Sequence, residues 1–196
     1  MSGELLMRIL VLAVLILSLT SVNGAAAARW SLGANLGVTW LSIPNHEDYT
    51  LVSAPSQGLG TVLGTPGIRI GLAPHDSRSE IFFDTGFMRI STSPSSATVL
   101  QFTGNYQYSL SKGSTHPYVT AGVGLSWLSN DQVFFYQNDD VAPMVGGGVG
   151  IRHRLHHGFG TLRAEARYDR FAAEDAVYFR ESDMWALKLG FDMWGN

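Results

Sequence analysis

The chain has 196 residues, 45% of them hydrophobic and only 15% charged, and its 22 glycines indicate one domain rich in strands and turns once any targeting segment is removed. The absence of cysteine excludes a disulfide framework, thiolate metal sites and a lipidated N-terminal cysteine. A net charge of -3 with no run of Lys or Arg argues against nucleic acid as a partner.

Residues 1–28 have the pattern of a secretory signal peptide. Arg8 supplies the positive charge, an apolar run follows from Ile9 to Leu17 and extends to Val22, and Ala25 to Ala28 resemble a cleavage site. The apolar run is shorter than the ~20 residues of a membrane-spanning helix. We therefore expect export and cleavage, leaving 29–196 as the mature domain. Because no later segment resembles a transmembrane helix, any membrane residence of that domain must use strands.

Eight later segments alternate apolar and polar or small residues with a period of two, which predicts β-strands. The polar stretch from Leu41 to Gly60 is expected to be a loop. Pro66 makes the second strand the least regular. The predicted strands, in chain order, are Trp30 to Trp40, Val62 to Leu72, Ile81 to Ile90, Val99 to Leu110, Pro117 to Leu128, Met144 to Leu155, Thr161 to Asp169 and Trp185 to Met193.

The apolar faces of these strands can point inward, as in a soluble lipocalin-like barrel, or outward to lipid. In the first case, the water-facing side of Pro117 to Leu128 would carry glycines and no charge. It would also place Arg163, Glu165 and Arg167 in one row of opposite signs on the surface. In a narrow membrane barrel, small residues relieve crowding and buried charges pair with each other. The second orientation is therefore favoured.

This orientation predicts a polar network inside the barrel. Its expected role is structural, with a proton or ion path as the alternative, because eight strands leave no aqueous channel. The charged residues of this predicted network are Arg69, Asp84, Arg152, Arg163, Glu165, Arg167, Lys188 and Asp192.

Aromatic residues are expected outside, near strand ends, where amphipathic rings favour membrane interfaces. These predicted interface residues are Trp30, Trp40, Tyr106, Tyr108, Trp127, Tyr168 and Trp185.

The predicted connections alternate in length, with longer ones after the first, third, fifth and seventh strands. This asymmetry is typical of membrane barrels with both termini in the periplasm. The segments PYVTAGVGLSWL, VGGGVGIRHRL, TLRAEARYDRF and MWALKLGFDMW resemble the small outer-membrane β-barrel family, the OmpA-like and OmpX-like barrels, over Arg29 to Asn196. The resemblance implies an all-β, eight-stranded antiparallel up-and-down transmembrane barrel in the bacterial outer membrane. It also implies outer-membrane lipid, lipopolysaccharide and the barrel-assembly machinery as partners. Family members usually end on an aromatic residue, whereas Gly195 and Asn196 follow Trp194 here.

Some outer-membrane barrels of this size modify lipid A, which requires an activated serine and a histidine base facing the outer leaflet. Only His46 is predicted on the extracellular side. The other histidines are expected in or near periplasmic turns: His75, His116, His153, His156 and His157. No spacing suggests a metal site. We therefore expect no enzymatic activity, no cofactor and no metal.

The expected role is structural or adhesin-like, with a narrow pore for small solutes or ions as the alternative. Arg89 and Arg170 lie on the lipid-facing register at the extracellular rim, where they are hypothesised to contact lipopolysaccharide phosphates, simple solvated charges being the alternative. The loops 129–141 and 171–183 contain apolar stretches that can extend the strands and pair with a surface ligand. Packed loop side chains are the alternative interpretation.

Overall fold

The computed structural model describes residues 28–42, 49–52, 62–74, 78–92, 95–131, 140–155, 160–171 and 182–195. Within these ranges, no helix has the length and apolar character needed to cross a membrane. The described secondary structure consists of strands, whose bounds are β1 Ala28–Ser42, β2 Tyr49–Val52, β3 Val62–Pro74, β4 Ser79–Thr92, β5 Ser95–Ser109, β6 Thr115–Asp131, β7 Asp140–Arg154, β8 Gly160–Phe171 and β9 Asp183–Gly195.

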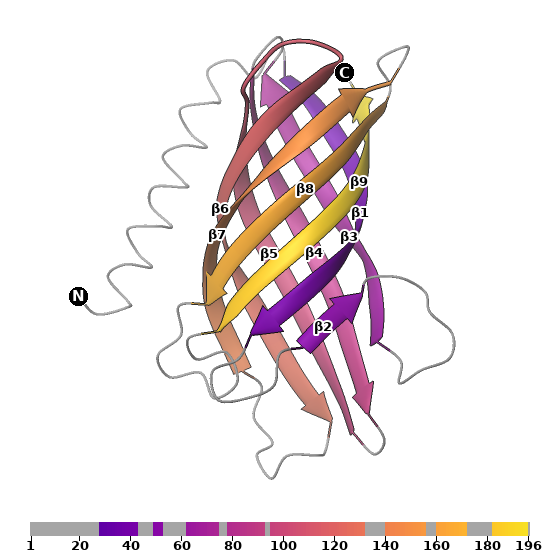
Figure 1. Cartoon of the computed structure of the whole chain (residues 1–196), viewed down its shortest axis with the longest axis vertical. Helices are drawn as coiled ribbons and strands as arrows, with labels where there is room; N and C mark the ends of the chain where they lie inside the picture. The colour runs from indigo at the N-terminus through magenta and orange to yellow at the C-terminus, as the bar shows by residue number, and fades with distance from the viewer. Residues whose placement is uncertain are drawn as a thin grey trace, which may run out of the picture.

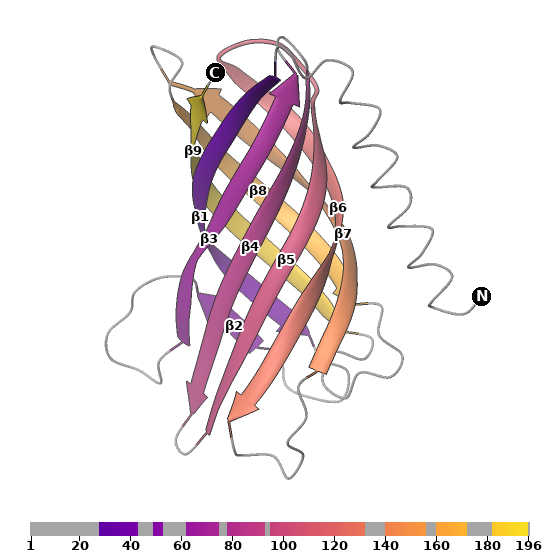
Figure 2. The same ribbon diagram turned by 180° about the vertical axis from the view of Figure 1, so that it is seen from behind.

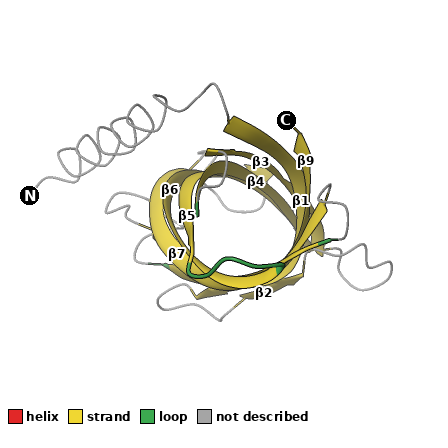
Figure 3. Ribbon diagram, turned by 90° about the horizontal axis from the view of Figure 1, so that it is seen from above, coloured by secondary structure: helices red, strands yellow, loops and turns green. Residues whose placement is uncertain are grey.

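Eight of these strands form a closed antiparallel barrel (Figure 1). Each of β3 to β8 pairs with the next strand in the chain, β1 pairs with β3, and β9 pairs back with β1. The closing pair runs in register from Trp30 opposite Gly195 to Ser42 opposite Asp183. The view along the axis shows the ring that results (Figure 3). Closure pairs the backbone groups of the first and last strands, as a lipid environment requires. The predicted fold class is confirmed.

Apolar side chains cover the outside of the barrel, and polar side chains fill the inside. Phe83, Val149 and Leu189 are 62%, 60% and 67% exposed, whereas Gln107 and Ser126 are 0% exposed. A water-soluble barrel has the opposite arrangement, because apolar burial drives its folding. The lipocalin-like orientation is therefore excluded.

Phe82 is an apolar side chain that points inward. It is fully buried, and the guanidinium carbon of Arg69 lies 3.3 Å from its ring centroid. The predicted strand around Phe82 has apolar residues on both faces, so alternation assigns its inward face less clearly. The face of an aromatic ring attracts a cation, so the Arg69 guanidinium is a favourable neighbour for the inward Phe82 ring.

Every predicted strand differs from the observed one at one end or both. The expected loop from Leu41 to Gly60 contains β2, which pairs with β1 from Val38 opposite Val52 to Leu41 opposite Tyr49. The connection between the predicted strands that end at Ile90 and begin at Val99 is shortened to residues 93–94, because β4 and β5 remain paired to Thr92 opposite Ser95. β4 also begins at Ser79 rather than Ile81.

The irregularity expected at Pro66 is present. The β3–β4 pairing shifts register between Thr65 and Ile68, which is consistent with a proline that donates no backbone hydrogen bond to a ladder.

The two ends of the barrel differ. We call the end with the connections 75–78, 110–114 and 155–159 the turn end; the first residues of β1 and the last of β9 lie there too. The opposite end, with the connections 43–61, 93–94, 132–139 and 172–182, is the loop end. Figure 2 shows β4, β5 and β6 projecting farthest at the loop end.

Candidate functional site

Glu80 is the centre of an ion-pair network inside the barrel. Its Oε1 atom accepts hydrogen bonds from Arg69 Nη2 at 3.0 Å and Ser31 Oγ at 3.3 Å, and its Oε2 accepts one from Arg152 Nη2. The exposed fractions of Glu80 and Arg69 are 2% and 0%. One carboxylate therefore neutralises guanidinium groups from two strands that are not neighbours, β3 and β7.

Asp192, on β9, is the second carboxylate of this layer. It accepts two hydrogen bonds from Arg163, one from Nε and one from Nη2 at 2.9 Å. Its Oδ1 and Oδ2 atoms also lie 3.9 Å from Arg69 Nε and Arg152 Nη2. Arg69 and Arg152 are thus shared between Asp192 and Glu80, so the three arginines and two carboxylates form one continuous cluster. A two-pronged contact such as that of Arg163 fixes the orientation of both groups.

A second layer lies nearer the loop end, around Arg167. Its Nε atom donates to both oxygens of Asp169, at 2.9 and 2.8 Å, and its Nη1 donates to Asn105 Oδ1 at 2.7 Å. Glu165 lies 3.9 Å away and accepts a hydrogen bond of 2.9 Å from the Tyr118 hydroxyl.

Asn35 links Arg163 of the first layer to Asp84 on β4. Its Oδ1 accepts a hydrogen bond of 2.7 Å from Arg163 Nη2, and its Nδ2 donates to Asp84 Oδ1 at 3.2 Å. The amide therefore bridges a guanidinium and a carboxylate whose strands, β8 and β4, do not pair.

Seven of the eight residues predicted for the interior network are less than a tenth exposed and lie inside the barrel: Arg69, Asp84, Arg152, Arg163, Glu165, Arg167 and Asp192. Lys188 is less buried and forms no salt bridge to a described residue; it lines a small cavity near the loop end. The prediction missed the buried polar partners Ser31, Asn35, Glu80, Asn105, Gln107, Tyr118 and Asp169.

Glu80 was missed for a specific reason. The predicted strand begins at Ile81, so Glu80 falls just outside it. Extending the alternation from Asp84 back through Phe82 places Glu80 on the same inward face. That signal was available in the sequence.

The network separates two cavities. A cavity of about 60 Å³ lies toward the loop end, and one of about 380 Å³ opens at the turn end. On β8, Thr161 lines the larger cavity and Arg167 the smaller one, with Arg163 and Glu165 between them. The paired charges therefore fill the middle of the barrel.

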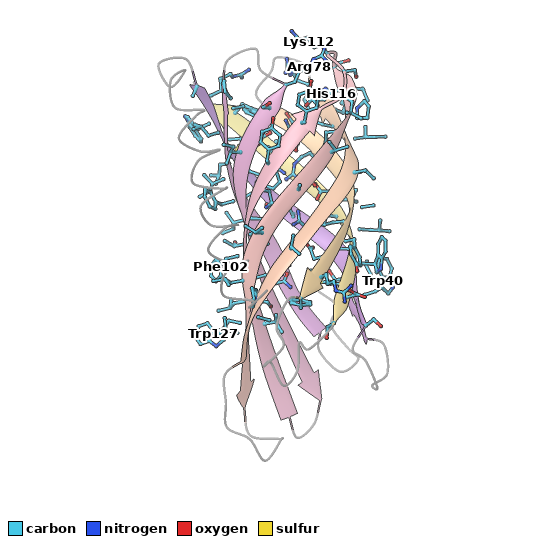
Figure 4. All side chains as sticks on the ribbon, turned by 90° about the vertical axis from the view of Figure 1, so that its left-hand side faces the viewer. Trp40, Arg78, Phe102, Lys112, His116 and Trp127 are labelled. Atoms are coloured by element: carbon cyan, nitrogen blue, oxygen red, sulfur yellow. The ribbon has the colours of Figure 1, made fainter. Side chains whose placement is uncertain are left out.

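The predicted interface aromatics point outward at both ends. Trp40, Trp185 and Tyr168 stand side by side on β1, β9 and β8, and the Tyr168 and Trp185 ring centroids are 4.7 Å apart. The Tyr168 hydroxyl also donates to Asp183 Oδ1 at 2.7 Å. Figure 4 shows Trp40 and Trp127 toward the loop end. Near the turn end, the exposed aromatics are Trp30, Tyr106 and Tyr108.

The other predicted residues are only partly described. His116 and His153 are both at the turn end, where their Nδ1 atoms lie 3.1 Å from Gly113 O and 2.7 Å from Thr115 Oγ1. Arg170 is exposed near the loop end of β8. The described residues contain no group of three His, Cys, Asp or Glu side chains that could hold a metal ion. Outside the described residues lie His46, His75, His156, His157 and the side chain of Arg89.

This closed barrel, with its apolar exterior and charged interior, defines the class: the chain has the fold of the small eight-stranded outer-membrane β-barrels. It is similar to the crystal structure of Neisserial surface protein A, NspA, with a TM-score of 0.63, 13% identity, and coverage of 84% of this chain and 96% of that one. It is also similar to Ail, the attachment invasion locus protein of Yersinia pestis, solved in complex with the heparin analogue sucrose octasulfate. That TM-score is 0.56, with 8% identity and coverage of 86% and 99%. No family model and no curated protein matches the sequence.

Proposed function

We propose that this protein is a non-enzymatic outer-membrane barrel with a structural or surface-interaction role. The turn end faces the periplasm in this proposal and the loop end faces the outside. The observation that carries the surface role is the part of β4, β5 and β6 that continues beyond the exposed aromatic residues of the loop end.

This projecting sheet extends past Trp127 on β6. β6 ends four residues later, at Asp131, and remains paired with β5 as far as Ser96. At about 3.3 Å per residue, the extension is roughly 13 Å long. The pairing of β6 with β7 stops earlier, at Leu128 opposite Asp140. Among the described residues, none pairs with the last residues of β6 on the β7 side, and a strand edge of this kind can pair with another chain.

The proposed surface ligand would bind at this edge and at loops 129–141 and 171–183. The apolar stretches of these loops, Val133 to Tyr136 and Val177 to Phe179, lie outside the described residues. Ail, one of the similar barrels named above, is described as an attachment invasion locus protein. A surface-interaction role for the present chain is consistent with that likeness of fold.

The test compares binding of cells or extracellular matrix by the purified wild-type protein and by a variant lacking residues 131–140. Arg154→Ala, at the turn end, is the matched control. Heat-modifiable gel mobility verifies the barrel in each variant. Binding that is lost in the deletion variant and kept in the control supports a surface-interaction role. If the wild-type protein and both variants are folded but none of them binds, the result supports a structural role instead. If boiling left the mobility of the wild-type protein unchanged, the membrane barrel itself would be refuted.

The second candidate function is a narrow pore, which is favoured by the polar cavities toward both ends of the barrel. We expect no discrete conductance in planar bilayers, because paired charges occupy the section between those cavities. Stable conductance steps from the purified wild-type protein would favour the pore.

The absence of catalytic activity is part of the proposal. A lipid A-modifying site needs a histidine base near the outer leaflet. The two described histidines, His116 and His153, are at the turn end, which supports the proposal. Export would remove residues 1–28, and the barrel-assembly machinery would insert the mature chain.

Contact with lipopolysaccharide would occur at the loop end. Arg170 is exposed on β8 there, and Arg89 is on β4 in the same half of the barrel. Cationic side chains at a membrane rim can bind anionic headgroups.

A further inference from the structure

We propose that the turn-end mouth of the barrel is a binding site for a small, multiply charged anion of the phosphate class. The mouth is the cavity of about 380 Å³, a volume within the range of ligand pockets. The cationic side chains that line it come from four strands or their connections and are Arg29, Arg78, Lys112, Arg152 and Arg154. This site is distinct from the proposed surface role, which belongs to the opposite end.

The described residues that line the mouth carry an excess of positive charge. Among the described residues, the five cationic side chains that line the cavity face one lining carboxylate, Glu80. Glu80 is already engaged by Arg69 and Arg152 inside the barrel. The salt bridges between described residues include none from Arg29, Lys112 or Arg154. An anion entering the cavity would therefore meet about four positive charges that the central network does not neutralise.

Two guanidinium groups at the mouth have an unused buried donor, as Arg69 and Arg167 have in the central network. The Nε atoms of Arg29 and Arg152 are inaccessible to solvent, and neither has a hydrogen-bond partner among the described residues. Arg152 is only 7% exposed. A buried donor without a partner costs free energy, and an oxyanion is the acceptor that matches a guanidinium best.

Trp194 holds these two arginines in place. Their guanidinium carbons lie 5.5 Å (Arg29) and 5.4 Å (Arg152) from its ring centroid, within cation–π range. The indole Nε1 donates to Thr161 Oγ1 at 2.8 Å, which fixes the ring. Trp194 also lines the cavity, so its indole N–H is a built-in reporter of binding.

The outer cations complete the mouth. Arg78, Lys112 and Arg154 are exposed, and Figure 4 shows Arg78 and Lys112 beside His116 at the turn end. The inner arginines thus form the base of the cavity and the outer cations its entrance. A phosphate group carries several acceptor oxygens and can contact more than one of these cations, which favours the phosphate class over a single small halide.

The experiment uses the purified chain in nanodiscs of zwitterionic phosphatidylcholine. Inorganic pyrophosphate is titrated at low ionic strength and followed by calorimetry and by the NMR signal of the Trp194 indole N–H, assigned with Trp194→Phe. We expect saturable binding at one site and a shift of the Trp194 signal without a shift of the Trp127 signal at the other end. Screening by about 0.15 M salt should weaken the binding.

Variants locate the site. Lys112→Ala/Arg154→Ala removes two exposed cations that are not part of the ion-paired network and should weaken binding about tenfold or more, equivalent to about 1.4 kcal/mol. Lys188→Ala/Arg170→Ala removes the same charge toward the loop end and should leave the affinity unchanged. Equal weakening by both double variants, or the lack of saturable binding in the wild-type protein, would overturn the proposal.

A lipid arm distinguishes two sources of the anion. In nanodiscs containing phosphatidylglycerol, a headgroup that occupies the mouth would shift the Trp194 signal before pyrophosphate is added and would weaken the apparent affinity for pyrophosphate. Unchanged affinity would assign the site to a soluble phosphate compound. Both results support the anion site and differ only in its occupant.

Discussion

Glu80→Ala is expected to destabilise the barrel more than any change of an exposed charge. Glu80 contacts the guanidinium groups of Arg69 and Arg152, and all three side chains are less than a tenth exposed. Removing the carboxylate leaves two buried positive charges with weaker partners. Breaking a buried ion pair by deleting one member typically costs about 3–5 kcal/mol.

The remaining contacts place the expected loss near the lower end of that range. Asp192 stays 3.9 Å from a nitrogen of each arginine, and Gln107 keeps its hydrogen bond of 3.1 Å from Arg69. We therefore expect Glu80→Ala to lower the free energy of unfolding by about 3 kcal/mol. Glu80→Gln should cost less, because its amide oxygen still accepts a hydrogen bond from one arginine.

The assay is urea-induced unfolding of the refolded protein in lipid vesicles, followed by tryptophan fluorescence and by heat-modifiable gel mobility. Lys188→Ala is the control; because Lys188 forms no salt bridge to a described residue, its effect should stay within about 0.5 kcal/mol. In a double-mutant cycle, Glu80→Ala and Arg152→Met should be coupled by about 1 kcal/mol or more. A loss below about 1 kcal/mol for Glu80→Ala with no measurable coupling would refute the reasoning, since it would mean that the interior is screened like a surface.

Two further predictions concern close packing and the membrane rim. Gly150→Ala should lower the free energy of unfolding by about 1–3 kcal/mol in the same assay, because a Cβ atom at Gly150 would overlap the side chain of Tyr118, whose hydroxyl donates to Glu165. Gly86→Ala is the tolerated control, because the atom nearest to the added Cβ would be 3.4 Å away. Arg89→Ala/Arg170→Ala should reduce the lipopolysaccharide that co-purifies with the protein, whereas Arg78→Ala at the turn end should not; unchanged co-purification in the double variant would mean that these arginines are simple solvated charges.

The barrel could be predicted from the sequence because its main signal is local. A period of two assigns each side chain to a face, and the same two faces recur along the chain, so strands and their orientation follow from neighbours in sequence. Pro66 shows that even a local irregularity is visible in this way, since the register shift occurs beside it. The short strand β2 was not predicted, because its pairing with β1 depends on how a long connection folds back.

The contacts inside the barrel are harder to predict from the sequence, because they depend on the position of each residue along the barrel axis as well as on the face of the strand to which it belongs. Glu80 and Arg152 are 72 positions apart on strands that do not pair, and Asn35 and Arg163 are 128 apart. Alternation places all four inside, but the stagger of the strands around the closed barrel decides which side chains reach the same level. The sequence therefore predicts the members of the network better than their partners.

Charges are distributed unevenly along the barrel axis, so the middle of the barrel and its turn end differ in their need for an external anion. Four arginines and five carboxylates in the middle form the ion pairs and hydrogen bonds that link Glu80, Asp84, Glu165, Asp169 and Asp192 to Arg69, Arg152, Arg163 and Arg167. This section needs no external ion, because nearly every charge has a partner of opposite sign within it. Four additional cations line the turn-end mouth without a matching set of described carboxylates. A barrel stabilised only by internal pairing would not require that excess, and an anion held at the mouth accounts for it.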